Sequence, residues 1–149
     1  MNIPAIRGKI GNTVYYSANF SFQQINELVD RKVGNEIYTS KTLKDRLQRS
    51  LTDNSGKIKQ YILEQDDRFF NALVLAVYDG EPQWTEIRFE LDEDEFPNVG
   101  ILHFNGKEKI FPVDGQHRVE GIKEAVKKNP ALVTETISVI SVSYTHLRA

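Results

Sequence analysis

Five consecutive residues have the types and spacing most suited to chemistry: Asp114 to Arg118, reading Asp-Gly-Gln-His-Arg. The apolar residues before them predict a short strand, and the residues after them have the apolar spacing of a helix. The first N–H groups of a helix have no partner inside it and lie at the positive end of its dipole, so they attract anions. The Arg118 guanidinium adds a permanent charge that can bind phosphate oxygens in pairs. The pattern predicts a phosphate-binding turn.

Structural roles compete with functional ones in this turn. Asp114 is expected to cap the helix whatever else it does, and Gly115 to allow the tight bend. Helical spacing puts Arg118 beside the buried stripe and His117 on roughly the opposite side, so the two need not share a ligand. The alternatives are an Arg118 ion pair with a carboxylate such as Asp114, and an exposed His117 without a role. The stripe consists of Val119, Ile122, Ala125 and Val126.

The pentapeptide matches, letter for letter, the motif of the DGQHR-domain proteins, and the chain resembles the DndB branch of that family. Weaker similarity covers about residues 4–140, with supporting stretches at 14–16, 20–22, 67–73 and 77–84. The resemblance implies a DNA-binding regulatory protein of a DNA phosphorothioate (sulfur) modification system. Its turn would contact a phosphate of DNA or of a bound nucleotide.

Two polar residues before the next predicted strand also match polar residues of this family. Arg68 and Asn71 would face the site of the DGQHR turn if the strand that follows them is the neighbour of the strand before the turn. The alternative is that they are simply polar residues at the start of a strand.

The same strand, turn and helix resemble the ParB/sulfiredoxin superfamily, in which a Gly-x-x-Arg turn binds nucleotide phosphates. Gln116 stands where sulfiredoxins have their catalytic cysteine and ParB proteins a glutamate. The chain has no cysteine, which excludes the sulfiredoxin reaction. A neutral amide is also a poor Mg²⁺ ligand and no base. The resemblance therefore favours phosphate binding over hydrolysis.

Other functions stay open. A nucleotide hydrolase or nuclease could use Asp114 and His117, so the chain is not assigned as an enzyme or a non-enzyme. The cofactor is unknown; a nucleoside triphosphate with Mg²⁺ is one candidate. A third interpretation is an interaction scaffold without affinity for nucleotide or DNA. No metal site is predicted, since no acidic stretch has the spacing of a calcium loop.

Charge is unevenly distributed along a chain whose net charge is only −2. Residues 41–59 contain six lysines and arginines against two aspartates, whereas residues 86–95 contain six acids against one arginine. The first stretch could contact a DNA backbone, and the second is acidic; two solvated faces of opposite sign are the alternative. The proposed backbone contacts are Lys41, Lys44, Arg46 and Arg49.

Length and composition predict one globular domain. The 149 residues are too few for two comfortable domains, and the lack of cysteine excludes disulfides and thiolate zinc sites. No apolar stretch is long enough for a signal peptide or a membrane span. We therefore expect a cytoplasmic protein with DNA as its partner, nucleotide as a second ligand and no membrane contact, and leave self-association open.

The last eight residues are expected to be foreign to the fold. Residues 142–149 resemble a read-through of sequencing-adapter DNA, and they follow an apolar run at 137–140 that has the character of a buried strand. We therefore take residues 1–141 as a DGQHR domain, the N-terminal part of a longer protein, and exclude the rest from functional argument.

Local patterns predict an α/β fold with a mixed sheet. Ser21 and Gln24 have capping-box spacing at the start of a helix, and Phe20 and Ile25 have the spacing of a hydrophobic staple. Further helices are expected over 41–52, 56–66 and from Gly115 to about 129. Strands are expected over 14–16, 72–78 and 85–91, from 137 onward, and in a hairpin of 100–104 with 107–113 around Asn105-Gly106.

Overall fold

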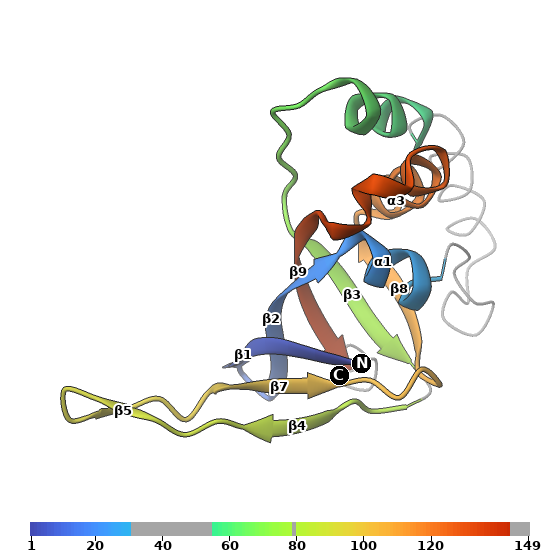
Figure 1. The fold of residues 1–149 in the computed structure, drawn as a ribbon. Helices are drawn as coiled ribbons and strands as arrows, with labels where there is room; N and C mark the ends of the chain where they lie inside the picture. The colour runs from blue at the N-terminus through green and yellow to red at the C-terminus, as the bar shows by residue number, and fades with distance from the viewer. Residues whose placement is uncertain (31–54, 79, 144–149) are drawn as a thin grey trace.

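The computed structural model describes residues 1–30, 55–78 and 80–143 (Figure 1). The strands are β1 (Asn2–Ile10), β2 (Thr13–Ser21), β3 (Leu73–Tyr78), β4 (Gln83–Glu86), β5 (Glu90–Leu91), β6 (Asp94–Glu95), β7 (Val99–His103), β8 (Lys109–Asp114) and β9 (Thr136–Ser143). Seven of them form one sheet in the order β4-β7-β1-β2-β9-β3-β8. Its β3–β9 pair is parallel and its other neighbouring pairs are antiparallel. The predicted α/β fold with a mixed sheet is confirmed.

The helices gather beside the sheet in Figure 1. They are α1 (Phe22–Leu28), α3 (Gln116–Lys128), the 3-10 helix η1 (Pro130–Thr134) and the helical residues 55–64. The helix expected over 56–66 is therefore present, ending two residues early. The helix expected over 41–52 lies outside the described residues. Among the described helices, none is long and apolar enough to cross a membrane.

Helix α1 begins as its sequence predicts. The Ser21 hydroxyl accepts a hydrogen bond from the Gln24 N–H (3.0 Å), and the Gln24 side chain accepts one from the Ser21 N–H (2.8 Å). This reciprocal pair is a capping box, and it satisfies two donors that the helix itself cannot. Phe20 and Ile25, on either side of the cap, are both fully buried. The cap therefore fixes where the end of β2 turns into α1.

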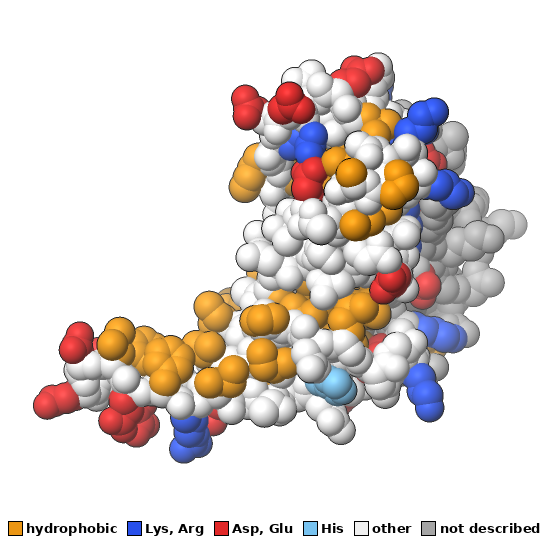
Figure 2. Space-filling model, viewed as in Figure 1, with side chains coloured by type: hydrophobic (Ala, Val, Ile, Leu, Met, Phe, Trp, Pro, Cys, Tyr) orange, Lys and Arg blue, Asp and Glu red, His pale blue; other side chains and the backbone are white. Residues whose placement is uncertain are grey.

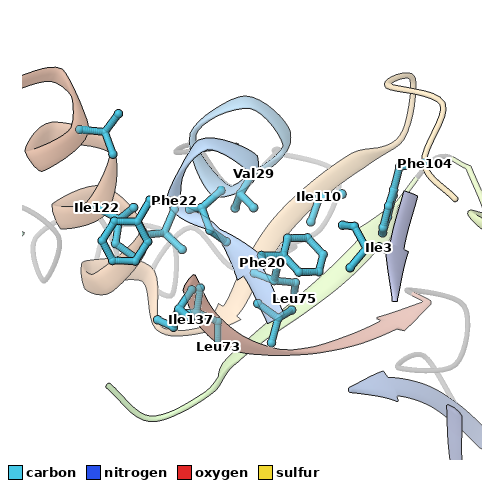
Figure 3. Close-up of a cluster of buried hydrophobic side chains, with 14 of the residues drawn as sticks. Ile3, Phe20, Phe22, Val29, Leu73, Leu75, Phe104, Ile110, Ile122 and Ile137 are labelled. Atoms are coloured by element: carbon cyan, nitrogen blue, oxygen red, sulfur yellow. The ribbon is translucent and has the colours of Figure 1, made fainter. Parts of the chain in front are cut away.

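One hydrophobic core joins the sheet to the helices (Figure 3). Phe20 and Phe104 meet edge to face, with ring centroids 6.0 Å apart, and link β2 to the loop that follows β7. The predicted stripe of α3 is buried in this core, and so are Leu73 and Leu75 of β3. Strand β3 is thus a covered central strand, as its apolar run predicts, and it holds β8 and α3 in place.

The predicted hairpin around Asn105-Gly106 is wrong. Strand β7 pairs with β1 and β4, whereas β8 pairs with β3 on the other side of the sheet. The Glu108 carboxylate accepts hydrogen bonds from the N–H groups of Asn105 and Gly106 instead, at 3.0 and 3.1 Å. The loop is therefore closed by a side chain rather than by pairing of its flanking strands. An Asn-Gly pair favours a tight turn but does not select the partners of the strands beside it.

The predicted strand over 85–91 is interrupted. Strand β4 ends at Glu86, residues 87–89 are not in a strand, and β5 resumes at Glu90. The apolar side chains of Ile87, Phe89 and Leu91 are exposed rather than facing the core. Alternation indicates a strand with two unlike faces, but it does not show that the apolar face is covered.

Two further strands differ in length from their predictions. The strand expected over 14–16 extends through 13–21 as β2, and it forms a hairpin with β1 through Gly11-Asn12, where Gly11 has a positive φ of 56°. Strand β9 continues to Ser143, and Val142 is buried. It thus includes the first two residues of the segment expected to be foreign, while residues 144–149 lie outside the described part.

Candidate phosphate-binding turn

Strand β8, one glycine and helix α3 build the DGQHR turn. Asp114 ends β8 opposite Val74 of β3, and Gly115 then adopts a left-handed conformation with a φ of 101°. The Gly115 carbonyl accepts the first helical hydrogen bond, from the Val119 N–H at 3.0 Å. A left-handed residue at this point favours glycine, since other residues meet steric resistance there. The predicted strand, bend and helix are confirmed.

The predicted capping role of Asp114 is wrong. The N-cap of α3 is Gly115, and no side chain of the described residues caps this helix. Asp114 is still paired in β8, one residue too early for a capping position. Its side chain is 72% exposed and stands 3.8 Å from Arg118 Nη2. The N–H groups of the first turn are therefore not covered by a capping side chain, as an anion site at a helix start requires.

Arg118 is directed toward β3. Its Nη1 donates to the carbonyl oxygens of Asn71 and, at 3.4 Å, Ala72. Its side chain is only 16% exposed. The guanidinium thus fastens the first turn of α3 to the chain just before β3. The ion pair of Arg118 with Asp114, which was the structural alternative, is therefore present. Among the described residues, the hydrogen bonds to Asn71 and Ala72 use only Nη1, one of the three nitrogens that carry the five N–H donors of arginine.

Gln116 and His117 complete the turn. The Gln116 side-chain amide donates to the Val113 carbonyl at 3.2 Å, which ties the start of α3 back onto β8. Both residues are half-buried, whereas Asp114 is exposed. An anion near the first turn would therefore meet backbone donors and the positive charge of Arg118, but also the carboxylate of Asp114.

The two upstream polar residues are placed differently from each other. Strands β3 and β8 are neighbours, which is the arrangement in which Arg68 and Asn71 were expected to face the DGQHR turn. Asn71 reaches the turn through its carbonyl, which Arg118 binds. Arg68 is held elsewhere: it donates to the carbonyls of Ile62, at 2.8 Å, and Gln65, and it pairs with the Glu135 carboxylate. It thus ties the end of the helix over 55–64 to the start of β9.

Two residues that hold α3 in place, Gly121 and Lys123, were not predicted from the sequence. Gly121 lies against the helix over 55–64 so closely that a Cβ there would stand 2.4 Å from Ile58 Cγ2. Lys123 is buried, and its Nζ donates to the carbonyl of Asn26 in α1 at 2.8 Å. A glycine and a lysine inside a helix normally indicate a weak position and an exposed face. Only the packing of three helices explains them.

A separate cavity of about 560 Å³ lies at the other end of β3. Its lining residues come from four strands and the loops between them, so the sequence did not predict a site here, although some of them lie in the stretches 14–16 and 77–84. They include Arg7, Tyr16, Glu81 and the buried Ser141. Burial raises the pKa of Tyr16; nearby Arg7 lowers it and Glu81 raises it further, and burial is the largest cause.

Some predicted site residues cannot be placed. The proposed backbone contacts Lys41, Lys44, Arg46 and Arg49 lie outside the described residues. Within the described part of the chain, no three histidine, aspartate or glutamate side chains gather as they would around a metal ion.

Comparison with known proteins identifies the family. A family model described as DndB, DNA-sulfur modification-associated, matches residues 3–148, nearly the whole chain. No curated protein and no solved structure matches the chain significantly. The ParB/sulfiredoxin resemblance therefore stays a prediction, as does the role of the DGQHR turn. The extent of the family match shows that the chain belongs to the DndB family, which is associated with DNA sulfur modification.

Proposed function

We propose that the protein is a DNA-binding regulatory component of a DNA sulfur modification system, and that a DNA phosphate binds at the start of α3. The observation that carries the proposal is the uncapped first turn of α3 behind the left-handed Gly115. A 13-residue helix directs its N-terminal donors and dipole to this point. Family membership supplies the system in which such a site would act.

Arg118 holds this site in position. By binding the carbonyls of Asn71 and Ala72 it fixes the first turn against β3, so the backbone donors are oriented before a phosphate arrives. Its charge, which lies next to Gly115, favours an anion as well. The proposed phosphate site is thus smaller than the set of residues predicted from the sequence. It consists of Gly115, Gln116, His117 and Arg118, and the Asn71 carbonyl supports it by binding Arg118. Arg68, bound to Glu135, supports the fold around it.

DNA requires more than one phosphate contact, and the basic stretch 41–59 is the proposed second one. A single phosphate at a helix start gives little affinity, whereas several lysine and arginine contacts release counterions and make binding strongly dependent on salt. Substituting Lys44, Arg46 and Arg49 with alanine should therefore flatten the dependence of DNA affinity on salt. An unchanged slope would place the DNA surface elsewhere.

A charge introduced into the turn tests the phosphate site directly. Gln116→Glu, measured without Mg²⁺ so that no metal ion can bridge carboxylate and phosphate, adds a carboxylate to the first turn of α3, where it should interact favourably with the helix dipole and repel phosphate. We expect DNA affinity lowered about tenfold, the effect of losing one charged contact, and a stability close to that of the unaltered protein, because the dipole interaction offsets the lost hydrogen bond to the Val113 carbonyl. Gln24→Glu, in the first turn of α1 and compatible with its capping box, is the matched control.

The binding measurement separates the candidate ligands. Fluorescence anisotropy with plain and phosphorothioate-containing duplexes, and calorimetry with ATP, should show DNA binding that Gln116→Glu weakens and Gln24→Glu does not. Equal binding by both variants would refute the phosphate site. Mg²⁺-dependent ATP hydrolysis or DNA nicking would instead support the enzyme alternative that uses Asp114 and His117.

A further inference from the structure

Residues 87–98 form a two-stranded arm that projects from the sheet (Figure 1). It continues the β4–β7 pair: the Ile87 N–H donates to the Val99 carbonyl at 2.8 Å, and the Phe96 N–H to the Phe89 carbonyl at 3.3 Å. Beyond them, β5 and β6 pair through Glu90 and Glu95. The arm is therefore ordered by its own backbone hydrogen bonds, although it lies away from the hydrophobic core.

The arm carries apolar side chains that the described chain does not cover (Figure 2). Ile87, Phe89 and Leu91 are 45%, 44% and 61% exposed. The rings of Phe89 and Phe96 are stacked, with centroids 4.9 Å apart and planes 14° from parallel. Beside them is a hollow of about 320 Å³, lined by Arg88, Phe89, Glu90, Glu95, Phe96 and Pro97. Contiguous exposed apolar surface on a stable scaffold is typical of a protein interaction site.

Acidic residues surround this apolar surface. The arm contains five carboxylates, Glu90, Asp92, Glu93, Asp94 and Glu95, against the single cation Arg88. Arg88 is itself engaged with Glu86 of β4, at 2.8 Å. The local field is therefore strongly negative, and a partner must bring positive charge.

The turn at the tip favours charge over local stability. Asp92 and Glu93, the two residues between β5 and β6, both have positive φ, 51° and 70°. A two-residue hairpin loop of this kind prefers Asn-Gly, because most side chains resist a positive φ. Aspartate suits the first position as asparagine does, but Glu93 stands where glycine is preferred, which a need for a stable turn does not explain.

We propose that this arm is a docking site for a partner protein that presents an apolar side chain, held in the hollow beside Phe89 and Phe96, within a rim of lysine and arginine. Aromatic residues in a concave apolar patch are the usual anchors of an interface, and the charged rim selects the partner and speeds its approach. The arm thus engages protein, while the proposed DNA contacts lie at the DGQHR turn and in the 41–59 stretch.

Charge decides between the other occupants. Five carboxylates repel a phosphate backbone, so nucleic acid is a poor occupant of the arm. A second copy is also a weaker match, because the whole chain carries 21 acidic residues against 19 lysines and arginines. A basic protein surface is the occupant that meets both the apolar hollow and the acidic rim.

A model peptide tests the chemistry of the site. The probe is a fluorescein-labelled peptide that alternates lysine with phenylalanine; a peptide with glutamate in place of lysine is its control, and a short duplex represents nucleic acid. Anisotropy with the full chain should show binding of the lysine peptide alone, with amides of residues 88–96 becoming protected from hydrogen exchange. Phe89→Ser/Phe96→Ser should weaken binding about tenfold, as expected for loss of interface anchors.

Matched variants separate the arm from a general attraction between opposite charges. Asp92→Asn/Glu93→Gly creates the preferred Asn-Gly turn while removing two charges, so it should weaken binding roughly threefold without loss of folding. Phe69→Ser, which changes an 82% exposed residue outside the arm, and Asp66→Asn/Asp67→Asn should leave binding unchanged.

The proposal is overturned if the unaltered protein does not bind the lysine peptide, if the variants outside the arm weaken binding as much, or if the glutamate peptide binds equally well. Protection of the amides of residues 88–96 by the duplex alone, without peptide, would show nucleic acid as the occupant instead. Arm-dependent self-association in sedimentation velocity would show a second copy. A result restricted to the arm variants supports the docking site, whatever the outcome for the DGQHR turn.

Discussion

The guanidinium of Arg118 packs against Gly115. A Cβ built on Gly115 would stand 2.9 Å from Arg118 Nη2 and 2.4 Å from Leu73 Cδ2, closer than such atoms approach. The glycine is therefore required twice, once by its left-handed backbone and once by the arginine and leucine packed against it. Glycine and arginine occur together in the motif because the bend at Gly115 leaves the space into which the Arg118 guanidinium packs.

Substituting Gly115 tests this double requirement. Gly115→Ala should lower the free energy of unfolding by about 1 kcal/mol for its positive φ and by a further 1–3 kcal/mol or so for the close contacts. Gly106→Ala is the matched control, since Gly106 also has a positive φ, 88°, but no atom within 4 Å of a Cβ. Urea unfolding of both variants isolates the steric contribution; equal losses would show that the contacts yield without cost.

Arg118→Ala is expected to affect stability as well as binding. It leaves the carbonyls of Asn71 and Ala72 without their partner, which should cost about 1–3 kcal/mol. In conditions where the variant is folded, it should also weaken phosphate-ligand binding roughly tenfold, and Arg118→Lys should recover only part of both losses because the planar fork is absent. Denaturation and calorimetry measure the two effects separately.

Arg68→Ala serves as the control for that experiment. Arg68 likewise binds backbone carbonyls and a carboxylate with little exposure, but it lies away from the turn. It should therefore destabilise the protein to a similar extent without changing the affinity for phosphate ligands. If Arg68→Ala and Arg118→Ala weaken binding equally, Arg118 acts only through the fold.

Tyr16 should make stability depend on pH above about 10. Burial favours its neutral hydroxyl and raises its pKa above the ordinary tyrosine value of 10.0, which is close to that of the unfolded chain. The stabilisation is therefore fully present below pH 10 and is lost as the pH rises through the folded pKa. Urea midpoints measured from pH 9 to 11 should fall, and Tyr16→Phe should flatten this fall. An identical slope in the variant would assign the loss to other groups.

Two truncations define where the fold ends. Removing residues 144–149 should leave the melting temperature nearly unchanged if they are foreign. Removing 142–149 also deletes the buried Val142, which pairs with Tyr15 and Ala76, and should lower it by several degrees, equivalent to about 1–2 kcal/mol. A large loss from the shorter deletion would show that the final six residues belong to the protein.

Sequence reasoning succeeded where neighbours along the chain determine the structure. The capping box of Ser21 and Gln24 and the glycine bend before α3 depend on residues a few positions apart. The burial of β3 depends on distant partners, but its continuous apolar run is sufficient to predict it. It failed where distant partners decide. Asn105-Gly106 has the composition of a hairpin turn, yet β8 pairs with β3, whose partner residues lie 31 to 40 positions earlier in the chain.

The site shows the same division. The DGQHR turn was predicted as a strand, bend and helix, but the direction of Arg118 depends on the carbonyls of Asn71 and Ala72, which no local pattern connects to it. Asp114 has the residue type of a cap and stands one position too early. Lys123 and Gly121 have the wrong types for a buried helix face, and only the crossing helices account for them.

The position of β9 in the sheet has a consequence for how the protein folds during its synthesis on the ribosome. The chain leaves the ribosome from its N-terminus, so the hairpin of β1 and β2 emerges first. In the sheet of the described strands, however, β9 (residues 136–143) lies between β2 and β3. The β3–β8 pair therefore cannot join β1, β2, β4 and β7 in the sheet until β9 has been synthesised. Such long-range pairing folds slowly, and the waiting strands expose edges that other chains can join. Nascent chains stalled before residue 136 should therefore depend on chaperones more than the finished protein does.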